Sequence, residues 1–467
     1  MKIVFASSEA LPYFKSGGLA DVSRSLPDAL VKRGHDVRIL HPLYSFVERK
    51  RYRLKKSAPI SVPWTGGSIS IPAYEHAVAG KATGVLLEHA AFENTSSPYE
   101  DHDVFTTGRR FALFSRAVLH YAKQWGADVI HLNDWQTGLV PAYGMIDDVV
   151  LPTVYSIHNL AYQGLFHNSI LEQIGLPSAL FRTENGLEFF GNVSFMKGGL
   201  ALSNRLSTVS PTYAQEIQTA EHGVGFEGLL RWRARDLFGI LNGIDTSYWN
   251  PAKDKLLPQL YDAKKLDVKD EIRAGLIEET GMDPNKPLLV VVSRLAQQKG
   301  IDIILGALPA LLDMGVNLFV LGDGNPGLSA QLGTLARRFP RNITTTPGGF
   351  HEPLAHRLYA GGDFFLMPSR YEPCGLGQMI AQRYGTPPIV RATGGLRDTV
   401  VDEQTGFVFQ RPVVGEFVRT VQRALRWWRG PHWNDLRVHC MAQDHSWTRS
   451  AEQYEAVYSS AMGVASS

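Results

Sequence analysis

The sequence predicts an α/β protein of two doubly wound domains, in each of which helices cover both faces of a parallel sheet. Its 467 residues exceed what one compact hydrophobic core accommodates and suit two domains. Near the start, an apolar run at residues 3–6 is followed by apolar residues at helical spacing up to Gly34, and then by another apolar run at residues 36–40. This order predicts a β-loop-α-β unit, and a second unit of the same kind begins at residues 288–292.

The other predicted elements continue this alternation. Predicted strands and helices are, in chain order, residues 111–125 (helix), 128–132, 153–157, 318–321, 364–367 and 388–390 (strands) and 446–461 (helix). The chain becomes polar and charged after residue 251, up to about residue 287, and we predict a linker near residues 245–255. We therefore expect one domain over residues 1–245 and another over residues 255–445, with a C-terminal helix at about 446–467 packing back on the first domain.

The composition excludes several classes of protein. The chain carries 47 basic and 45 acidic residues, so nothing indicates general attraction to nucleic acid or to a membrane surface. Only two cysteines, Cys374 and Cys440, are present, which argues against a disulfide framework or a zinc site. No apolar run approaches the ~20 residues that span a bilayer. Because residues 1–5 already read as part of a strand, we expect no signal peptide and a cytoplasmic protein whose partner is a small anion or a neutral polymer.

A glycine pair precedes the first predicted helix. Gly17 and Gly18 follow Lys15, so free backbone N–H groups and one point charge lie together at a helix start. Such a site suits a phosphate, although a glycine pair alone is equally consistent with a plain turn. Neither a dinucleotide-binding G-x-G-x-x-G nor a P-loop motif is present.

Polar side chains follow two predicted strands of the first domain. Asn133 and Asp134 come after one strand, and His158 and Asn159 come after the next. The carboxyl ends of parallel strands meet at one edge of a sheet, so we expect these groups to line one crevice, within reach of Tyr99 in the polar loop at residues 97–99. In isolation, His158 is equally well explained as a buried histidine bonded to the backbone.

Two loops of the second domain carry charge at strand ends. Arg294 and Lys299 lie five residues apart after the strand at 288–292, where they could grip a diphosphate from two sides; two solvated surface charges are the alternative. Glu372 lies between the strand at 364–367 and a helix predicted to start near Leu376, and Pro373 biases it away from helical geometry. Free N–H groups after this bend suit an anion or sugar hydroxyls, although Glu372 could simply cap the helix.

Together these motifs resemble those of bacterial glycogen synthases and plant starch synthases, in which two Rossmann-like domains face a central cleft in the GT-B arrangement. Six segments match the family's motifs in order: K-S-G-G-L-A-D-V at residues 15–22, H-N-L-A-Y-Q-G at 158–164, L-N-G-I-D at 241–245, S-R-L-A-Q-Q-K-G at 293–300, P-S-R-Y-E-P-C-G-L at 368–376 and T-G-G-L-R-D-T-V at 393–400. The resemblance covers nearly the whole chain.

The resemblance implies a retaining transfer of glucose from ADP-glucose to the non-reducing 4-hydroxyl of an α-1,4-glucan, either glycogen or a malto-oligosaccharide, without a cofactor. It implies catalytic roles for Lys15, Arg294 and Lys299 at the donor phosphates, for Glu372 facing the donor glucose and for His158 near the sugar 6-hydroxyl and anomeric carbon. Further residues are implied to bind substrate: Gly17, Gly18, Asp21, Tyr99, Asp134, Asn159, Asn242, Cys374, Gly375 and Leu376.

The residue types agree with such a reaction. Fixed cations and helix-terminal N–H groups stabilise the charge left on departing ADP, and the sequence has no ligand spacing typical of a metal site. Glu372 has no clear second carboxylate for a double displacement, so we expect a front-face transfer in which the leaving phosphate assists the acceptor hydroxyl. Because Lys15 belongs to the first domain and Glu372 to the second, we also expect the domains to close on the donor, with a hinge near residues 242–251.

The sequence departs from the family pattern at a few positions. Gly377 replaces the usual threonine, Ser16 lies at a variable position, and residues 348–351 are an unusual form of their loop. Two alternatives stay open: a related retaining glycosyltransferase that uses UDP-glucose or makes a short oligosaccharide, and an inactive glucan-binding paralogue. The Lys15 motif argues against the first, and joint retention of Lys15, Arg294, Lys299 and Glu372 against the second. No segment resembles the pyridoxal-phosphate site of glycogen phosphorylase.

Overall fold

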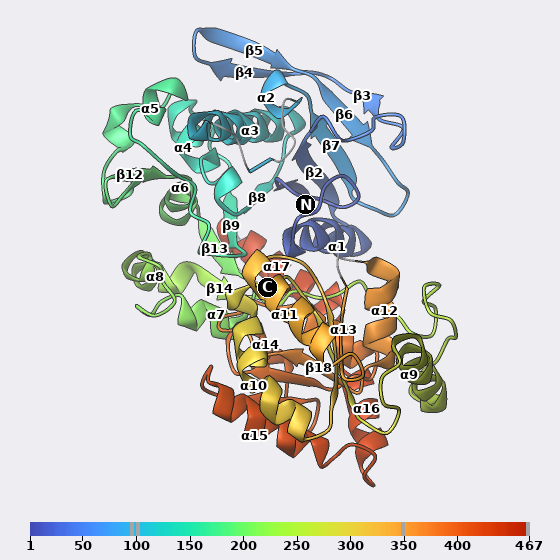
Figure 1. Cartoon of the computed structure of the whole chain (residues 1–467). Coiled ribbons are helices and arrows are strands. Elements are labelled where there is room, and N and C mark those ends of the chain that lie inside the picture. The colour runs from blue at the N-terminus through green and yellow to red at the C-terminus, as the bar shows by residue number, and fades with distance from the viewer. Residues whose placement is uncertain (94–97, 100–102, 347–350, 464–467) are drawn as a thin grey trace. The chain divides into compact units, whose positions relative to one another are not determined.

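The computed structural model describes residues 1–93, 98–99, 103–346 and 351–463. The chain forms two compact units (Figure 1). Unit 1 comprises Met1–Val209, Ala214–Gly243 and the segment from Trp447 onward, and unit 2 comprises Ser210–Tyr213 and Ile244–Ser446. The expected loop positions Ser97 and 348–350 lie outside the described residues.

Unit 1 is built on a nine-stranded sheet. Its strands are, in spatial order, β14 (Leu237–Gly239), β13 (Arg205–Thr208), β9 (Thr153–Ile157), β8 (Val129–Asn133), β1 (Lys2–Ala6), β2 (Asp36–Pro42), β7 (Thr83–Leu87), β6 (Ala73–His76) and β3 (Lys55–Lys56). The strands from β14 to β7 pair in parallel, whereas β6 and β3 continue the sheet antiparallel. Two small antiparallel sheets, β4 (Ile60–Trp64) with β5 (Gly67–Ile71), and β10 (Leu165–Phe166), β12 (Asn192–Ser194) and β11 (Glu188–Phe189), stand apart from it.

The helices of unit 1 cover this sheet. They are α1 (Gly18–Lys32), α2 (Ala90–Glu93), α3 (Val104–Trp125), α4 (Val140–Ile146), α5 (Ile170–Gln173), α6 (Phe195–Leu202), α8 (Glu227–Trp232) and α17 (Trp447–Ala461), with 3-10 turns η1 (Trp135–Thr137), η2 (Ser178–Leu180) and η3 (Ala234–Asp236). The C-terminal helix α17 is bonded into this unit: the Tyr458 hydroxyl lies 2.7 Å from Nδ1 of His131, and Arg33 donates to Glu455 at 2.7 Å. His131, a strand-end polar residue, is therefore part of the core.

Unit 2 contains a fully parallel six-stranded sheet. Its order is β17 (Ile343–Thr345), β16 (Asn317–Leu321), β15 (Leu288–Val292), β18 (Phe364–Met367), β19 (Pro388–Arg391) and β20 (Phe407–Phe409). The helices are α9 (Leu266–Thr280), α10 (Ile301–Asp313), α11 (Pro326–Arg338), α12 (Glu352–Gly361), α13 (Gly377–Arg383), α14 (Gly394–Thr399), α15 (Val414–Leu425) and α16 (Trp433–Met441), with the turn η4 (Gln297–Lys299). Helix α7 (Pro211–Glu216) is divided between the units.

The strand predictions made from apolar runs are confirmed. The strands predicted at 153–157, 288–292 and 364–367 have those bounds in the structure, and the others differ by one or two residues. The helix predicted at 111–125 is longer and starts at Val104, where Asp103 caps it by accepting a hydrogen bond from the N–H of Phe105. The first two turns of this helix contain polar residues, so apolar spacing alone does not indicate where the helix starts.

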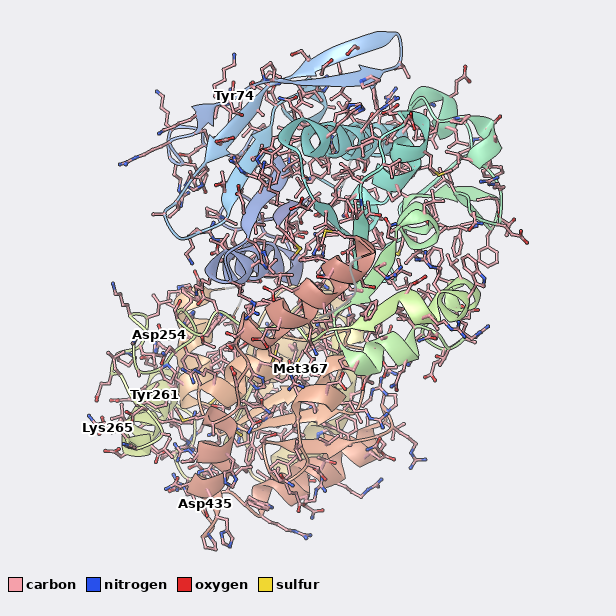
Figure 2. The ribbon with its side chains drawn as sticks, turned by 180° about the vertical axis from the view of Figure 1, so that it is seen from behind. Tyr74, Asp254, Tyr261, Lys265, Met367 and Asp435 are labelled. Atoms are coloured by element: carbon pink, nitrogen blue, oxygen red, sulfur yellow. The ribbon has the colours of Figure 1, made fainter. Side chains whose placement is uncertain are left out.

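Residues 245–255, where we expected a linker, lie within unit 2. The carboxylate of Asp254 is buried and lies 2.7 Å from Nδ1 of His356, and it also accepts a hydrogen bond of 2.6 Å from the Tyr384 hydroxyl. Tyr261 donates in turn to the backbone oxygen of Tyr384 at 2.7 Å. Figure 2 labels Asp254 on this segment and Tyr261, which follows the segment. The segment after residue 245 is therefore anchored in unit 2 by buried hydrogen bonds.

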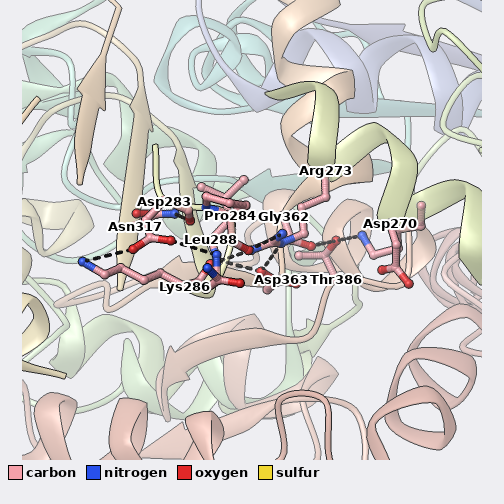
Figure 3. A network of polar contacts seen from close by, with 12 residues as sticks. Asp270, Arg273, Asp283, Pro284, Lys286, Leu288, Asn317, Gly362, Asp363 and Thr386 are labelled. Carbon is pink, nitrogen blue, oxygen red and sulfur yellow. Dashed lines mark hydrogen bonds and ion pairs between the residues drawn. The ribbon is translucent and has the colours of Figure 1, made fainter. Parts of the chain in front are cut away.

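A buried ion pair ties helix α9 to the amino ends of two strands in unit 2 (Figure 3). Arg273 Nε donates to Asp363 Oδ2 at 2.7 Å, and both side chains are 7% exposed. The same carboxylate oxygen accepts the backbone N–H of Leu288 at 2.7 Å. Lys269, also on α9, donates to the carbonyl of Ala360 and to Thr386 at 2.6 Å each, and burial lowers the pKa of its ammonium well below its usual value. These contacts lie at the end of the sheet where the strands begin, opposite to the carboxyl ends of the strands.

Each parallel sheet has one point where the strand order reverses. In unit 1 the chain runs from β1 outward to β2 and β7 and returns to β8 on the other side of β1. In unit 2 it runs from β15 to β16 and β17 and returns to β18 on the other side of β15. Open α/β sheets bind ligands at the carboxyl ends of the strands flanking such a point. No helix among the described residues is long and apolar enough to cross a membrane.

Candidate functional site

In unit 2, the loops after β15 and β18 bring Lys299 and Glu372 into direct contact. Lys299 Nζ donates to Glu372 Oε2 at 2.5 Å, and the two side chains are 16% and 6% exposed. The hydroxyl of Ser369 donates to the same carboxylate oxygen at 3.2 Å. Met367, the last residue of β18, is labelled in Figure 2. Sequence reasoning named both charged residues but did not place them against each other.

Close backbone packing holds this pair in place. Gly300, directly after Lys299, has φ +70°, and a Cβ built there would lie 2.1 Å from the carbonyl oxygen of Pro368. Gly394, at the start of α14, has φ +43°, and its Cβ would lie 1.9 Å from the carbonyl oxygen of Glu372. The N–H of the next glycine, Gly395, donates to that oxygen at 3.2 Å. Only glycine allows these approaches, so the backbone on both sides of the pair is fixed.

The other predicted residues of unit 2 lie in the same two loops. Arg294 is exposed, and its guanidinium has no partner among the described residues. Cys374 is buried, Gly375 has φ +75°, and Leu376 is the N-cap residue of α13. The space of the missing threonine side chain is filled: a Cβ on Gly377 would lie 2.9 Å from the ring of Phe365. The glycine at this departure from the family pattern thus accommodates an aromatic ring beneath the helix start.

In unit 1, a buried carboxylate that we did not predict organises the loop after β1. Glu9 is 5% exposed and accepts hydrogen bonds from the N–H of Ser16 at 2.7 Å and of Gly17 at 3.1 Å. It also accepts from the hydroxyl of Ser16 at 2.6 Å and from that of Tyr99 at 2.7 Å. Glu9 therefore joins the predicted glycine pair and the predicted tyrosine. A lone Glu after a strand carries no pattern that would have revealed this role.

Lys15 and Asp21 face each other at the start of α1. Lys15 Nζ lies 2.9 Å from Asp21 Oδ2, and the side chains are 47% and 25% exposed. Burial raises the pKa of the Asp21 carboxyl, and Lys15 opposes that rise. Gly17 is the N-cap residue of this helix and Gly18 its first residue. The ammonium and the helix N-terminus lie in one loop, as the sequence predicts.

Asp134 links the ends of β8 and β9. Its backbone is in the left-handed region, with φ +54°, and its Oδ1 accepts the N–H of His158 at 2.8 Å and, at 3.4 Å, that of Asn159. Burial raises the pKa of the Asp134 carboxyl to about 7; the bond from the His158 N–H lowers it, and the negative charge of Glu9 raises it further. Such backbone conformations are uncommon outside glycine and concentrate at functional sites.

His158 is held in a defined tautomer. The amide nitrogen of Asn133 donates to the carbonyl of Ala6 at 2.9 Å, so the amide oxygen faces His158 Nε2 at 2.8 Å. An amide oxygen only accepts, and therefore Nε2 carries the ring proton and Nδ1 presents a lone pair. Burial lowers the pKa of His158 to about 4, so the imidazole is neutral at pH 7. The sequence indicates Asn133 only as a polar residue at the end of a strand, with no sign of this role.

One predicted residue of unit 1 follows a different strand from the residues above. Asn242 follows β14, the edge strand, and is 8% exposed. Its Oδ1 is buried without a hydrogen-bond partner among the described residues. Among the described residues there is also no cluster of three or more His, Cys, Asp or Glu side chains that could hold a metal ion.

Comparison with known proteins places this geometry in a family. The family described as Starch synthase catalytic domain matches residues 2–232, and Glycosyl transferases group 1 matches residues 273–433. A protein named Glycogen synthase from Cellvibrio japonicus is 44% identical, with 98% of each chain covered, and Glycogen synthase 2 from Geobacter sulfurreducens is 41% identical, also over 98% of each chain.

Solved structures agree with these matches. The catalytic domain of Starch Synthase IV from Arabidopsis thaliana, bound to ADP and acarbose, is 32% identical with a TM-score of 0.90, covering 99% of both chains. A sucrose-phosphate synthase from Thermosynechococcus elongatus, 18% identical with a TM-score of 0.64 over 99% of each chain, shares the fold. The predicted α/β fold with two Rossmann-like units of the GT-B class is confirmed. The chain belongs to the glycogen and starch synthase family of glycosyltransferases.

Proposed function

We propose that this chain transfers glucose, with retention, from ADP-glucose to the non-reducing 4-hydroxyl of an α-1,4-glucan such as glycogen. The observation that carries the proposal is the contact between Lys299 and Glu372, with Arg294 in the same loop, at the carboxyl ends of β15 and β18. A carboxylate beside two cations at a strand-order reversal suits a sugar diphosphate. Relatives named glycogen synthase over nearly the whole chain support the same reading.

The proposed roles in unit 2 follow from this contact. Arg294 is exposed and its guanidinium is available to phosphate oxygens. An ammonium has three N–H donors, so Lys299 can keep its bond to Glu372 and still donate to a phosphate oxygen. Charge that develops on the β-phosphate as ADP leaves is then stabilised by groups already in position. Glu372, held next to the diphosphate site, favours the positive charge that develops on the glucose ring.

The proposed roles in unit 1 concern the donor as well. Lys15 adds a positive charge for the donor phosphate at the start of α1. His158 is neutral and presents Nδ1 as an acceptor, which suits the 6-hydroxyl of the donor glucose without opposing positive charge on the ring. A front-face transfer, in which the leaving phosphate takes the proton of the acceptor hydroxyl, needs no second carboxylate.

We also propose that the reaction requires no metal ion. Lys15, Arg294 and Lys299 supply the positive charge that divalent cations supply to diphosphates in other enzymes. The expected result is that the initial rate with ADP-glucose is the same in excess EDTA and in millimolar Mg²⁺. A loss of more than about tenfold in EDTA, restored by Mg²⁺, would contradict this part of the proposal.

The experiment that tests the function compares donors under matched conditions. ADP-glucose or UDP-glucose is supplied with glycogen, and nucleotide release and chain growth are measured together. We expect faster transfer from ADP-glucose, with the α-configuration of the new linkage read from its anomeric proton signal. Equal or faster transfer from UDP-glucose would overturn the donor assignment.

Arginine variants test the diphosphate site directly. Arg294→Gln should weaken ADP-glucose binding and transfer, because it removes a charge that faces phosphate oxygens. The matched control is Arg341→Gln. Arg341 is also exposed, but it precedes β17. It therefore lies at the end of the sheet where the strands begin, opposite to their carboxyl ends. Equal effects of the two substitutions would show that only the overall charge matters.

A further inference from the structure

The loop that carries His158 continues into an exposed apolar surface of unit 1. Tyr162, four residues after His158, is 54% exposed. Phe190, at the tip of the β11–β12 hairpin, is 77% exposed, and Val224, in the loop before α8, is 49% exposed. We call these three side chains the Phe190 platform. None of them is used by the reaction chemistry proposed above.

Contacts between neighbouring residues bring the three segments together. The side-chain amide of Gln163, next to Tyr162, donates to the carbonyl of Val224 at 2.9 Å. Gly225, next to Val224, lies under the hairpin tip: a Cβ there would lie 2.8 Å from the ring of Phe190. The ring of Phe189 stacks on that of Phe226 with centroids 4.1 Å apart. The loop after β9, the hairpin tip and the turn before α8 therefore form one surface.

The backbone conformation at this surface is unfavourable for the side chains it carries. Phe190 and Gly191 form a two-residue hairpin turn with φ +48° and +81°. Such turns strongly prefer Asn, Asp or Gly at the first position. Val224 is also left-handed, with φ +50°, which is a genuine outlier for a β-branched residue. Folding alone would favour other residues here, so the exposed Phe and Val point to a binding role.

The chemistry around the platform suits a neutral polyol. Two carboxylates of the neighbouring turns accept backbone hydrogen bonds, because Glu188 accepts the N–H of Gly191 at 2.8 Å and Glu227 accepts that of Gly225 at 3.0 Å. The rings of Tyr162 and Phe190 can stack on the C–H faces of sugars, and the amide of Asn192, beside the hairpin tip, can reach hydroxyls. Stable protein–protein interfaces use about 20–30 residues a side, far more than this platform provides.

We propose that the Phe190 platform binds the α-glucan chain and holds the acceptor near His158. This inference rests on the proposed function for the identity of the glucan, and it adds the surface that recognises it. The ring of Phe190 is the central contact, and Tyr162 lies on the loop that follows β9. The platform raises the affinity for long chains without taking part in the transfer of the glucosyl group.

The test uses a substitution that favours the fold. Phe190→Asn places a preferred residue in the hairpin turn, so the hairpin should be at least as stable while the ring is lost. We expect the half-saturating concentration of glycogen and of maltoheptaose to rise about tenfold, the range expected for a lost stacking contact, while the KM for ADP-glucose stays the same. Phe190→Tyr keeps the ring and should restore the affinity to within about twofold.

Glycogen binding can be measured without catalysis, and this measurement tests the inference separately from the proposed function. The full chain and its variants are run in native gels with and without glycogen, and the retardation is measured. Val150→Asn is the matched control, because Val150 is 91% exposed but precedes β9 and so lies at the opposite end of that strand from His158.

Each outcome decides one point. Retardation of the parent chain and of Val150→Asn, but not of Phe190→Asn, supports the platform even if no transfer activity is found. Unchanged retardation and unchanged glycogen saturation in Phe190→Asn overturn it and leave the proposed function standing. A lower molecular mass of Phe190→Asn in light scattering, with glycogen affinity unchanged, would show that the surface joins two copies of the chain and would also overturn the inference.

Discussion

Replacing Asn133 by Asp should make His158 titrate near neutral pH. The amide oxygen of Asn133 lies 2.8 Å from His158 Nε2, so a carboxylate at this position would face the ring nitrogen that carries the proton. In the parent chain, burial lowers the pKa of His158 to about 4. Two opposite charges about 4 Å apart attract by about 4 kcal/mol at an effective dielectric constant of about 20. At 1.36 kcal/mol per pKa unit this is about three units, which moves His158 to a pKa of about 7.

The consequence for catalysis has a definite sign. Below pH 7 the Asn133→Asp variant carries an imidazolium, which opposes positive charge on the sugar ring and removes the acceptor at Nδ1. We expect its kcat to fall as pH drops from 8 to 6, whereas the parent shows no titration of His158 in that range. At pH 8.5 the variant should recover most of its rate.

Two measurements check this expectation. Ring signals of His158 in ¹⁵N-labelled protein, assigned with a His158→Gln variant, give the tautomer and the pKa directly. Asn133→Leu is the control, because it removes the hydrogen bond without adding charge and should leave the pKa low. A pKa below 5 in Asn133→Asp, or a proton on Nδ1 in the parent chain, would refute the argument that Asn133 sets the tautomer.

Three further predictions concern carboxylates. Glu372→Gln should lower kcat by about 100-fold to 1000-fold, as for other electrostatic groups. Calorimetry should show that ADP binds with the same or higher affinity, because the substitution frees Lys299 from its ion pair. A near-normal kcat would show that Glu372 is only a structural cap. Asp134 has a folded-state pKa raised from 3.8 to about 7, so its contribution to stability is full below pH 4 and is lost as pH rises to 7. Relative to Asp134→Asn, the parent should therefore lose up to about 4 kcal/mol of unfolding free energy over that window, and parallel stability–pH curves would contradict this. Asp363→Ala should destabilise unit 2 by about 3–5 kcal/mol, because it leaves Arg273 buried without its ion-pair partner. Differential scanning calorimetry measures this loss. A melting temperature within 2 °C of the parent would show that the ion pair is dispensable for stability.

The positions of the strands and the identity of most candidate site residues could be predicted from the sequence. Parallel strands buried on both faces read as continuous apolar runs, so residues 153–157, 288–292 and 364–367 were located within their observed bounds. Lys15, Glu372 and the paired cations of the Ser293–Gly300 loop were recognised because they belong to contiguous motifs. Contiguous patterns of this kind can be recognised directly in the amino-acid sequence.

Contacts between segments far apart in the chain could not be predicted in the same way. Glu9 bonds to a tyrosine 90 residues away, and Asn133 to a histidine 25 residues away, and neither residue stands in a recognisable pattern. The segment at 245–255 was read as a linker because its polar residues gave no sign that Asp254 would be buried against His356 and Tyr384.

By itself, then, the sequence determined the alternation of strands and helices, the family and the residue types of the site, since these depend on local periodicity and contiguous motifs. Only the tertiary structure decided that Lys299 bonds to Glu372, that His158 is neutral with its proton on Nε2, and that Phe190 is exposed on a left-handed turn. The physical reason is that hydrogen-bond partners, burial and backbone conformation depend on which loops the strand order brings to one edge of the sheet. That order is set by packing across the whole of each unit, which no single stretch of the chain encodes.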